Sequence, residues 1–401
     1  MHVTDLIDAQ QDGHAMAQAF YTSPAVFEAD RRAVFGREWM LAGHVSEIPD
    51  CGDYLVFDIL KDSVIVCRDN DGDVRAFANV CRHRGSRLCI EARGNVRRLT
   101  CPYHAWVFNL DGSLFSARML EEHHDKSALG LFPVAVEIME GLIYVSLADD
   151  PPDFAPMRTH LTPCLAPFDL ANTKVAHREI YPVAANWKLL LENYNECYHC
   201  TPAHPEFSRS HATHMSDERV TPLNEAMAAR SAACNVPTDF IDRVGKHAPA
   251  PGADYAYNRY ALYDGFLTGS EDGTPLAPLL GQIGGHDGGA SDVYVGFLNP
   301  MLLYCDHAVL YRFLPIDTDT CAQEIIWMVH ADARAGRDYD LGRLTWLWDV
   351  TTKADKRIVE DNARGVASRH YVPGPLVPME GYLARFIDAY QTTLRQHEAR
   401  T

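Results

Sequence analysis

The chain has 401 residues, of which 47% are hydrophobic, and this is enough for two or three domains with substantial cores. Its formal net charge of -18 argues against nucleic acid or an anionic membrane surface as a partner. No run of about 18 apolar residues is present that would span a bilayer.

The cysteines indicate a reducing compartment. There are 11 of them, an odd number with uneven spacing. The first ten residues already carry two aspartates, which does not fit the basic-then-apolar form of a secretory signal. We therefore expect a cytoplasmic protein whose cysteines are free or bound to metal, rather than a disulfide framework.

The N-terminal half is expected to hold helices followed by a small β domain. Residues 1–37 are predicted to be helical and to pack on the C-terminal domain, and Ser23-Pro24 is a good cap and first turn. From Trp39 the pattern changes to short alternating segments separated by turns. The predicted strands are 54–57, 63–66, 74–77, 106–108, a short one at Leu114, and 142–147. Because the run 149–153 is acidic and rich in proline, we expect an all-β domain over residues 38–150.

The remainder, residues 151–401, is predicted to be an α+β domain. A strand over 175–183 is followed by a helix over 186–193, whereas 215–290 has no clear pattern. Three strands in hairpin order come next, over 293–304, 308–314 and 322–330, and two helices, over 338–369 and 379–397, follow them. Strands followed by helices, without βαβ alternation, indicate a central antiparallel sheet.

Two cysteine–histidine pairs form the strongest motif of the chain. They are Cys81-Arg82-His83 and Cys101-Pro102-Tyr103-His104, separated by 17 residues. Two thiolates on one iron and two imidazoles on the other are typical of a [2Fe-2S] cluster of raised potential. Zinc also takes such a ligand set, but zinc fingers put both cysteines in one pair and both histidines in the other. The mixed pairs favour an iron–sulfur cluster over zinc, and over unrelated core residues.

A second group of metal-ligand type follows the helix predicted at 186–193. Glu196, His199 and His204 lie close together in sequence. If the helix continues, His199 lies one turn after Glu196 on the same face. Pro202 and Pro205 are expected to stop the helix and to present His204 from the turn after it. Two imidazoles and a carboxylate from elsewhere make the facial triad of non-haem Fe(II) oxygenases.

Other interpretations of these histidines and acids remain open. A lone His199 near a helix end is usually structural, and Cys197 and Cys200 have the spacing to join the histidines in a zinc site. Glu196 is alternatively a solvated acid. Two further histidine pairs, His123-His124 and His211 with His214, are expected to lie on the surface.

Taken together, the two motifs resemble those of the Rieske non-haem iron oxygenases. The first resembles the Rieske signature, and the second resembles the mononuclear iron motif of the ring-hydroxylating oxygenase large subunits and their demethylase relatives. The resemblance covers nearly the whole chain, with the motifs in family order. It implies a Rieske domain and a helix-grip-like catalytic domain. It also implies the [2Fe-2S] ligands Cys81, His83, Cys101 and His104, and the Fe(II) ligands His199 and His204.

The third iron ligand is expected on the late helix, which offers Asp355, Glu360 and Asp361. In the family, a glycine follows the ligand aspartate by ten residues, and serine or a similar residue comes soon after. Asp355, Gly365 and Ser368 fit this spacing, whereas Asp361 leaves only four residues. We therefore predict Asp355. Ala363 stands where family members commonly have glutamine, a departure that does not touch the ligands themselves.

The resemblance also implies how electrons travel. The acid one turn before the first iron histidine, here Glu196, bridges the Rieske cluster of one subunit and the mononuclear iron of its neighbour, and this implies a homotrimer. No glycine-rich nucleotide motif follows a strand in this chain. We therefore expect a separate NAD(P)H-dependent reductase that carries a flavin and a plant-type [2Fe-2S] centre.

The substrate is inferred from a narrower resemblance. Residues 192–205, with Tyr371, 373–375 and Glu380, most resemble oxygenases of quaternary ammonium compounds, whereas large aromatic dioxygenases have aspartate at the position of Glu196. We therefore predict an enzyme that hydroxylates an N-methylated betaine, with oxidative N-demethylation and release of formaldehyde. Hydroxylation or dihydroxylation of an aromatic or heteroaromatic acid is the alternative, and a non-catalytic Rieske electron carrier is a second.

Aromatic residues are plentiful in the catalytic half. The faces of such rings attract a methylammonium group by cation–π interaction. The sequence does not show which of them face the iron. The candidates are Tyr194, Phe207, Tyr255, Tyr257, Tyr260 and Tyr263.

Overall fold

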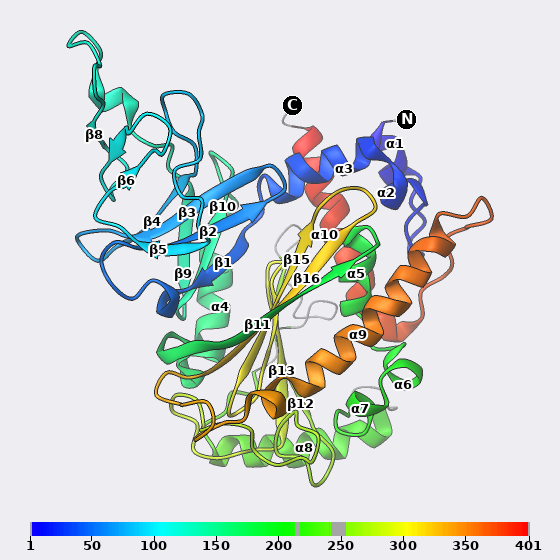
Figure 1. Cartoon of the computed structure of the whole chain (residues 1–401). Coiled ribbons are helices and arrows are strands. Elements are labelled where there is room, and N and C mark those ends of the chain that lie inside the picture. Colours follow the sequence, from blue (N-terminus) through cyan, green and yellow to red (C-terminus); the bar gives the residue numbers. More distant parts are fainter. Residues whose placement is uncertain (1, 213–216, 240, 242–253, 400–401) are drawn as a thin grey trace. The chain divides into compact units, whose positions relative to one another are not determined.

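The computed structural model describes residues 2–212, 217–239, 241 and 254–399 (Figure 1). It divides into two compact units, one formed by residues 1–34 with 153–401 and the other by residues 35–152. His214 and parts of the unassigned stretch 215–290 lie outside the described residues.

The smaller unit is built from three antiparallel sheets. The first has the order β1-β10-β9, from Met40–His44, Leu142–Ser146 and Ala135–Met139. The second has the order β4-β3-β2-β5, from Val74–Ala78, Asp62–Arg68, Asp53–Ile59 and Arg93–Asn95. The third, β6-β7-β8, comprises Leu99–Thr100, Val107–Phe108 and Leu114–Ser116. The predicted strands are present, but β1, β5, β6 and β9 were not predicted.

The larger unit is organised on one antiparallel sheet of six strands, in the order β11-β16-β15-β14-β13-β12 (Figure 1). The strands are Thr173–Val183, Cys321–His330, Ala308–Pro315, Pro300–Leu303, Gly289–Val295 and Tyr255–Ala261. The single strand predicted over 293–304 is wrong, because β13 and β14 are two paired strands with a turn at Gly296. The α+β class is confirmed.

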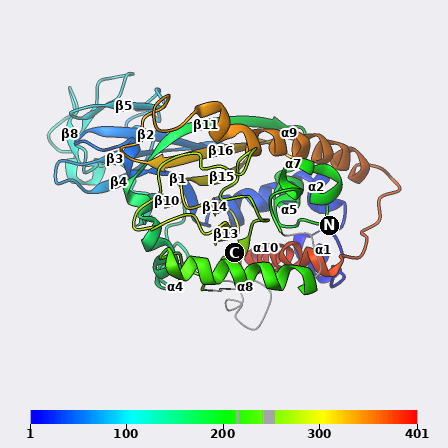
Figure 2. The ribbon, with the colours of Figure 1, turned by 90° about the horizontal axis from the view of Figure 1, so that it is seen from below.

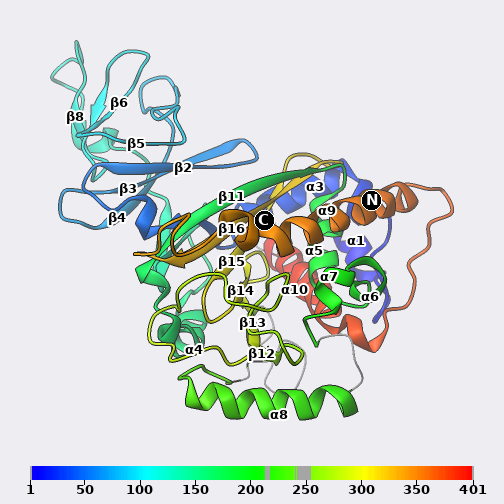
Figure 3. The same ribbon diagram turned by 60° about the horizontal axis from the view of Figure 1, so that its bottom comes forward.

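The helices of this unit lie before, between and after the strands. They are α1 Val3–Asp8, α2 Ala19–Thr22, α3 Pro24–Asp30, α4 Ala155–Leu165, α5 Trp187–Tyr194, α6 Cys200–Ala203, α7 Pro205–Ser208, α8 Asp217–Ala233, α9 Leu341–Val366 and α10 Gly381–Glu398. Helix α9 contacts β11, and α5 and α7 lie beside α9 (Figure 2). Helix α8 runs past the β12 edge of the sheet (Figure 3). Among the described helices, none has the length and apolar character needed to cross a membrane.

A buried polar network joins the N-terminal helices to α5. Lys188 and Asp30 form an ion pair with both side chains fully buried. Trp187 and Tyr390 also donate hydrogen bonds to Asp30, at 3.0 and 2.6 Å. One turn further along α5, Glu192 accepts from the hydroxyl of Tyr21 at 3.0 Å. Because a buried charge without a partner is costly, this network fixes α5, the helix that leads into the second motif.

Glu192 should make the stability of this unit fall as the pH rises. Burial raises its pKa to about 8, although Tyr21 and Lys188 act in the opposite direction. Between about pH 4.5 and about pH 8 the folded chain holds a proton that the unfolded chain has released, so folding becomes less favourable by at most about 5 kcal/mol across the window. Glu192→Gln is expected to lose this slope in denaturant unfolding measured at several pH values. Parallel pH profiles for the two proteins would show that the carboxyl is ionised.

Candidate active site

The four cysteine and histidine residues of the first motif lie in two loops of the same backbone design. In one loop, the Cys81 N–H donates to Ser86 O and Gly85 N–H donates to Cys81 O, at 2.8 and 3.0 Å. In the other, the equivalent bonds run from Cys101 to Trp106 and from Ala105 to Cys101, also at 2.8 and 3.0 Å. The fourth residue after each cysteine has positive φ, 75° for Gly85 and 55° for Ala105. Each loop therefore folds back and directs its cysteine and histidine to the same end of the unit.

These donors suit a cluster with one buried and one exposed side. Cys81 and Cys101 are buried free cysteines, whereas His83 and His104 are exposed, with ring centroids 4.6 Å apart. Burial raises the pKa of Cys101, but N–H groups of Tyr103 and His104 and the Cys81 and Ser86 side chains bring it below its usual value. Backbone donors of this kind stabilise thiolate ligands. The residues present thus fit a [2Fe-2S] cluster with its imidazole side facing outward.

The second motif begins where α5 ends. The Asn186 side chain accepts from the Lys188 N–H at 3.1 Å and starts the helix, which ends at Tyr194. The prediction that Glu196 and His199 share a helix face is therefore wrong. Both residues lie in the segment between α5 and α6, where the Glu196 carboxylate accepts the His199 N–H at 3.2 Å. As predicted, His204 comes from a turn, between α6 and Pro205 at the start of α7.

Asp355 reaches the two histidines from the middle of α9. Leu344, Leu347, Thr351 and Val359 mark the buried face of this long helix, and Asp355 falls on the same face. Asp361 is six residues on and therefore lies on the other side. Its side chain is 63% exposed and pairs with Arg364, and Glu360 pairs with Lys356.

The donors of His199, His204 and Asp355 lie within 4.8 Å of one another. Asp355 Oδ1 is 2.8 Å from His204 Nε2 and 3.4 Å from His199 Nε2. Two imidazole nitrogens and one carboxylate directed at one point are the donor set of a non-haem Fe(II) site with open positions. The residues present fit this metal.

A carboxylate also faces the far nitrogen of each imidazole. Glu196 bonds to His199 Nδ1, and Glu206 Oε1 lies 3.5 Å from His204 Nδ1. Glu206 accepts a hydrogen bond from Thr351 at 3.4 Å as well. A carboxylate hydrogen-bonded in this position, as Glu196 is to His199, fixes the tautomer and ring orientation of a metal-binding histidine. Glu206 was not predicted, although its place two residues after His204 was a possible signal.

The electrostatics of the cluster favour a positive charge between the three side chains. Burial lowers the pKa of His199, but hydrogen bonds to Asp355 and Glu196 raise it more, to about 9. Burial raises the pKa of Asp355, whereas the two histidines bring it below its usual value. The two carboxylates favour a positive charge on His199, at the place where a metal cation would bind.

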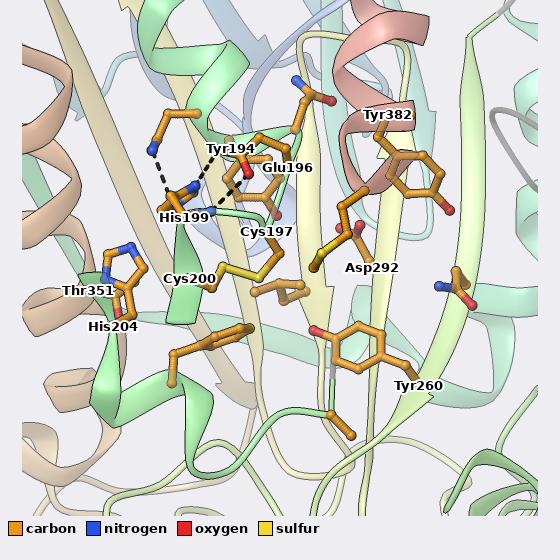
Figure 4. Close-up of a pocket in the computed structure, with 18 of the residues that line it drawn as sticks. Tyr194, Glu196, Cys197, His199, Cys200, His204, Tyr260, Asp292, Thr351 and Tyr382 are labelled. Carbon is orange, nitrogen blue, oxygen red and sulfur yellow. Dashed lines mark hydrogen bonds and ion pairs between the residues drawn. A yellow bond between two sulfur atoms is a disulfide. The ribbon is translucent and has the colours of Figure 1, made fainter. Parts of the chain in front are cut away.

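Cys197 and Cys200 form a disulfide across the segment that contains His199 (Figure 4). The expectation of cysteines that are all free or metal-bound is therefore wrong for this pair. The zinc alternative that used Cys197 and Cys200 is wrong for the same reason, because bonded sulfurs are not thiolate ligands. The other nine cysteines are free.

A cavity of about 450 Å³ opens beside the three-residue cluster. Of the six aromatic candidates, three line it, namely Tyr194, Phe207 and Tyr260. The other aromatic residues in its wall are Tyr294, Trp348 and Tyr382, and Asp292 lines it as well. The last four were not predicted. Figure 4 shows Tyr382 and Asp292. Asp292 and Tyr294 belong to β13, whose alternation was a possible signal for a shared face.

His211 is not on the surface as predicted. It is fully buried, stacks on Phe207 at 4.1 Å and shares a 2.7 Å hydrogen bond with the Tyr304 hydroxyl. Burial lowers its pKa to about 3, so this histidine is a neutral part of the core. His123 and His124 are exposed, as predicted.

Known protein families match both parts of the chain. Residues 38–130 match the Rieske [2Fe-2S] domain, and residues 170–396 match the ring hydroxylating alpha subunit (catalytic domain).

Two similar proteins can be aligned with nearly the whole chain. The glycine betaine monooxygenase oxygenase subunit of Chromohalobacter salexigens is 38% identical, over 97% of this chain and 88% of that protein. The subunit of the same name from Pseudomonas aeruginosa is 36% identical, over 92% and 86%. The crystal structure of the quaternary ammonium Rieske monooxygenase CntA in complex with L-carnitine has the same fold. Its TM-score is 0.72 at 23% identity, over 97% of this chain and 98% of that one.

These matches cover both units and agree with the two donor sets. They also exclude a non-catalytic electron carrier, because the catalytic domain of the family is present as well as the Rieske domain. The chain belongs to the ring-hydroxylating alpha subunit family and is the oxygenase subunit of a Rieske-type non-haem iron oxygenase system.

Proposed function

We propose that this oxygenase N-demethylates a quaternary ammonium compound of the glycine betaine type. The observation that carries the proposal is the 38% identity to a glycine betaine monooxygenase oxygenase subunit along 97% of the chain. The cavity supports it, because the rings of Tyr194, Tyr260 and Tyr382 line the space beside the proposed iron site. Ring faces are what a methylated ammonium group binds.

The metal-binding roles follow from the two donor sets. Cys81, His83, Cys101 and His104 hold the [2Fe-2S] cluster. His199, His204 and Asp355 would hold Fe(II), and all three line the cavity. When bound, the two centres supply electrons and activate O2 for insertion of one oxygen atom into a C–H bond.

The protein's own residues position the substrate methyl group and keep the histidines in place. Hydroxylation of an N-methyl carbon consumes O2, two electrons and two protons, and gives an N-hydroxymethyl group and water. Its C–N bond then breaks, the electron pair stays on nitrogen, and the hydroxyl proton is lost. The products are formaldehyde and the tertiary amine.

We further propose that electrons enter the iron site of one subunit from the cluster of another. The imidazoles of the cluster are exposed, and Glu196 already binds one iron ligand, so a second imidazole on the other side of Glu196 would complete a short route. A head-to-tail contact of this kind closes into a ring, for which we propose a homotrimer. Electrons reach the cluster from a separate NAD(P)H-dependent reductase with a flavin and a [2Fe-2S] centre.

Mixing subunits tests this route. Asp355→Ala removes the iron site, and His104→Ala damages the cluster, so each variant alone should be inactive. Co-expressed, they should regain activity, because a trimer then contains an intact cluster next to an intact iron site. Mixed trimers that remain inactive would contradict transfer between subunits, and light scattering of the native protein gives the subunit number directly.

A substrate panel tests the proposed chemistry. With reductase and NADH, substrate-dependent O2 uptake is expected for glycine betaine or a related N-methylated betaine, and product should form in proportion. If the protein does not turn over the betaines but converts an aromatic acid to a cis-diol or phenol, the proposal is overturned and the alternative is established.

A further inference from the structure

The disulfide between Cys197 and Cys200 encloses His199, one of the proposed iron ligands. Cys200 begins α6, and its carbonyl accepts the His204 N–H at 2.9 Å and the Ser208 hydroxyl at 3.0 Å. Cys197 lies between α5 and α6 and belongs to neither helix. The S–S bond therefore fastens the turn that contains His199 to the anchored start of α6.

The backbone of this turn sets the direction of the His199 ring. The Cys200 N–H donates to the Cys197 carbonyl at 3.2 Å, and the His199 carbonyl accepts the Ala203 N–H at 3.0 Å. Glu196 accepts the His199 N–H at 3.2 Å and also bonds to its Nδ1. A cross-link restricts the other conformations that such a short loop can take. The disulfide thus helps to keep the imidazole directed at the proposed iron site.

Both cysteines can be reached from the cavity. Cys197 and Cys200 belong to its lining, and the close-up shows their S–S bond beside His199, among the side chains that line this space (Figure 4). Cys197 is half-buried, whereas Cys200 is 6% exposed. A small thiol that enters the cavity therefore meets the disulfide without unfolding of the chain, and Cys197 is the less buried of the two targets.

The other nine cysteines are free, and this indicates what kind of disulfide the pair forms. Cys81 and Cys101 remain free although their side chains are in hydrogen-bonding contact, and the proposed cluster needs both of them as thiolates. A chain with this requirement works where thiols persist. Disulfides in such surroundings are typically those that form and break as the redox conditions change.

We infer that Cys197 and Cys200 are a reversible redox site that controls the iron affinity of the site at His199, and that its reactant is a small thiol–disulfide couple of the glutathione type. One glutathione thiolate attacks the Cys197 sulfur, the S–S bond breaks, and Cys200 leaves as a thiolate that takes up a proton. A second glutathione attacks the mixed disulfide and releases Cys197 as a thiol. Oxidised glutathione leaves, and the protein disulfide has gained two electrons and two protons.

The two states differ in how firmly His199 is held. In the disulfide state, the donor atoms of His199, His204 and Asp355 lie within 4.8 Å of one another. In the dithiol state, the turn is no longer covalently joined to α6. Loss of a group that orients a metal ligand typically lowers metal affinity by about 10- to 100-fold. Reduction should therefore weaken iron binding, and this step rests on the proposed role of His199 as an iron ligand.

Titration of the native protein with glutathione tests the redox site. The protein is equilibrated without O2 at graded ratios of oxidised to reduced glutathione, and alkylation with mass spectrometry counts the thiols at Cys197 and Cys200. Both are expected to pass together from disulfide to dithiol as the ratio falls. A disulfide that persists in reduced glutathione alone overturns the inference, and so does a pair that stays dithiol in oxidised glutathione.

Iron binding is measured on the two states after glutathione is removed. Competition with a chromophoric chelator gives the Fe(II) dissociation constant, which should be about 10- to 100-fold higher for the dithiol state. Equal constants overturn the control of iron. If neither state binds Fe(II) at this site, the iron site of the proposed function is contradicted, and the control of iron with it. Mass spectra that show exchange of the two cysteines remain a separate result.

Two variants separate this pair from the other cysteines. Cys197→Ser combined with Cys200→Ser should keep the dithiol affinity at every glutathione ratio, and an affinity that still changes with the ratio overturns the inference. Cys51→Ser removes an exposed free cysteine of the smaller unit and should respond as the native protein does. If the double variant loses the visible spectrum of the Rieske cluster, the two states of the native chain decide the result.

Discussion

Asp355→Ala is expected to lower the iron content from about three to about two atoms per chain, with the visible spectrum of the Rieske cluster intact. Among the described residues, Asp355 is the carboxylate that pairs with both His199 and His204, at 3.4 and 2.8 Å. Without it, the two imidazoles remain but the carboxylate that completes the donor set is gone. Substrate-dependent O2 uptake should fall to background. Metal analysis and absorption spectra of the same sample measure both parts of the prediction.

The matched control is Asp361→Ala, six residues along the same helix. Because the Asp361 side chain is 63% exposed and pairs only with Arg364 among the described contacts, this variant should retain its iron and its activity. If Asp355→Ala keeps a full complement of iron, the assignment of the third ligand is wrong. Loss of iron from Asp361→Ala would assign the third ligand to Asp361 instead.

The second large effect is expected from Glu196→Gln. Glutamine preserves shape and contact with His199, but it removes the charge that we propose to join two imidazoles. Both metal centres should persist, whereas single-turnover oxidation of a prereduced Rieske cluster, with substrate and O2 present, should slow by about 10- to 100-fold. Stopped-flow absorbance of the cluster, with product measured in the same experiment, follows the transfer directly.

Glu206→Gln provides the comparison for this variant. Glu206 faces the other proposed iron ligand, His204, and accepts a hydrogen bond from Thr351. The substitution should weaken iron binding without slowing cluster oxidation in molecules that retain iron. Equal rates for Glu196→Gln and the native protein would remove the bridging role, and equal slowing in both variants would assign the effect to histidine orientation.

The metal motifs are local in sequence, which is why they were predictable. Cys81 with His83, and Cys101 with His104, fall within single turns. Asp355 was predicted from the family spacing to Gly365, and α9 places it beside the two histidines. Short strands without alternation were missed because they depend on pairing with a strand distant in sequence. β5 is Arg93-Gly94-Asn95, is exposed throughout, and exists because it pairs with β2.

The aromatic wall of the cavity was less predictable because it is assembled from distant segments. Tyr194, Asp292 and Tyr382 come from α5, β13 and α10, and only the folded sheet brings them together. β12 was obscured by Arg259, a charge inside a buried strand. Its partner Asp287 is fully buried in the loop before β13, so the ion pair that permits the strand spans 28 residues of sequence.

N-demethylation of a betaine is best tested by the stoichiometry of a single reaction. The purified oxygenase, supplied with reductase, NADH and glycine betaine, is expected to release formaldehyde and dimethylglycine in equal amounts. Each should match the O2 consumed, and omission of the betaine should abolish both. Substrate-dependent O2 consumption that yields a hydroxylated product with no formaldehyde would contradict the account.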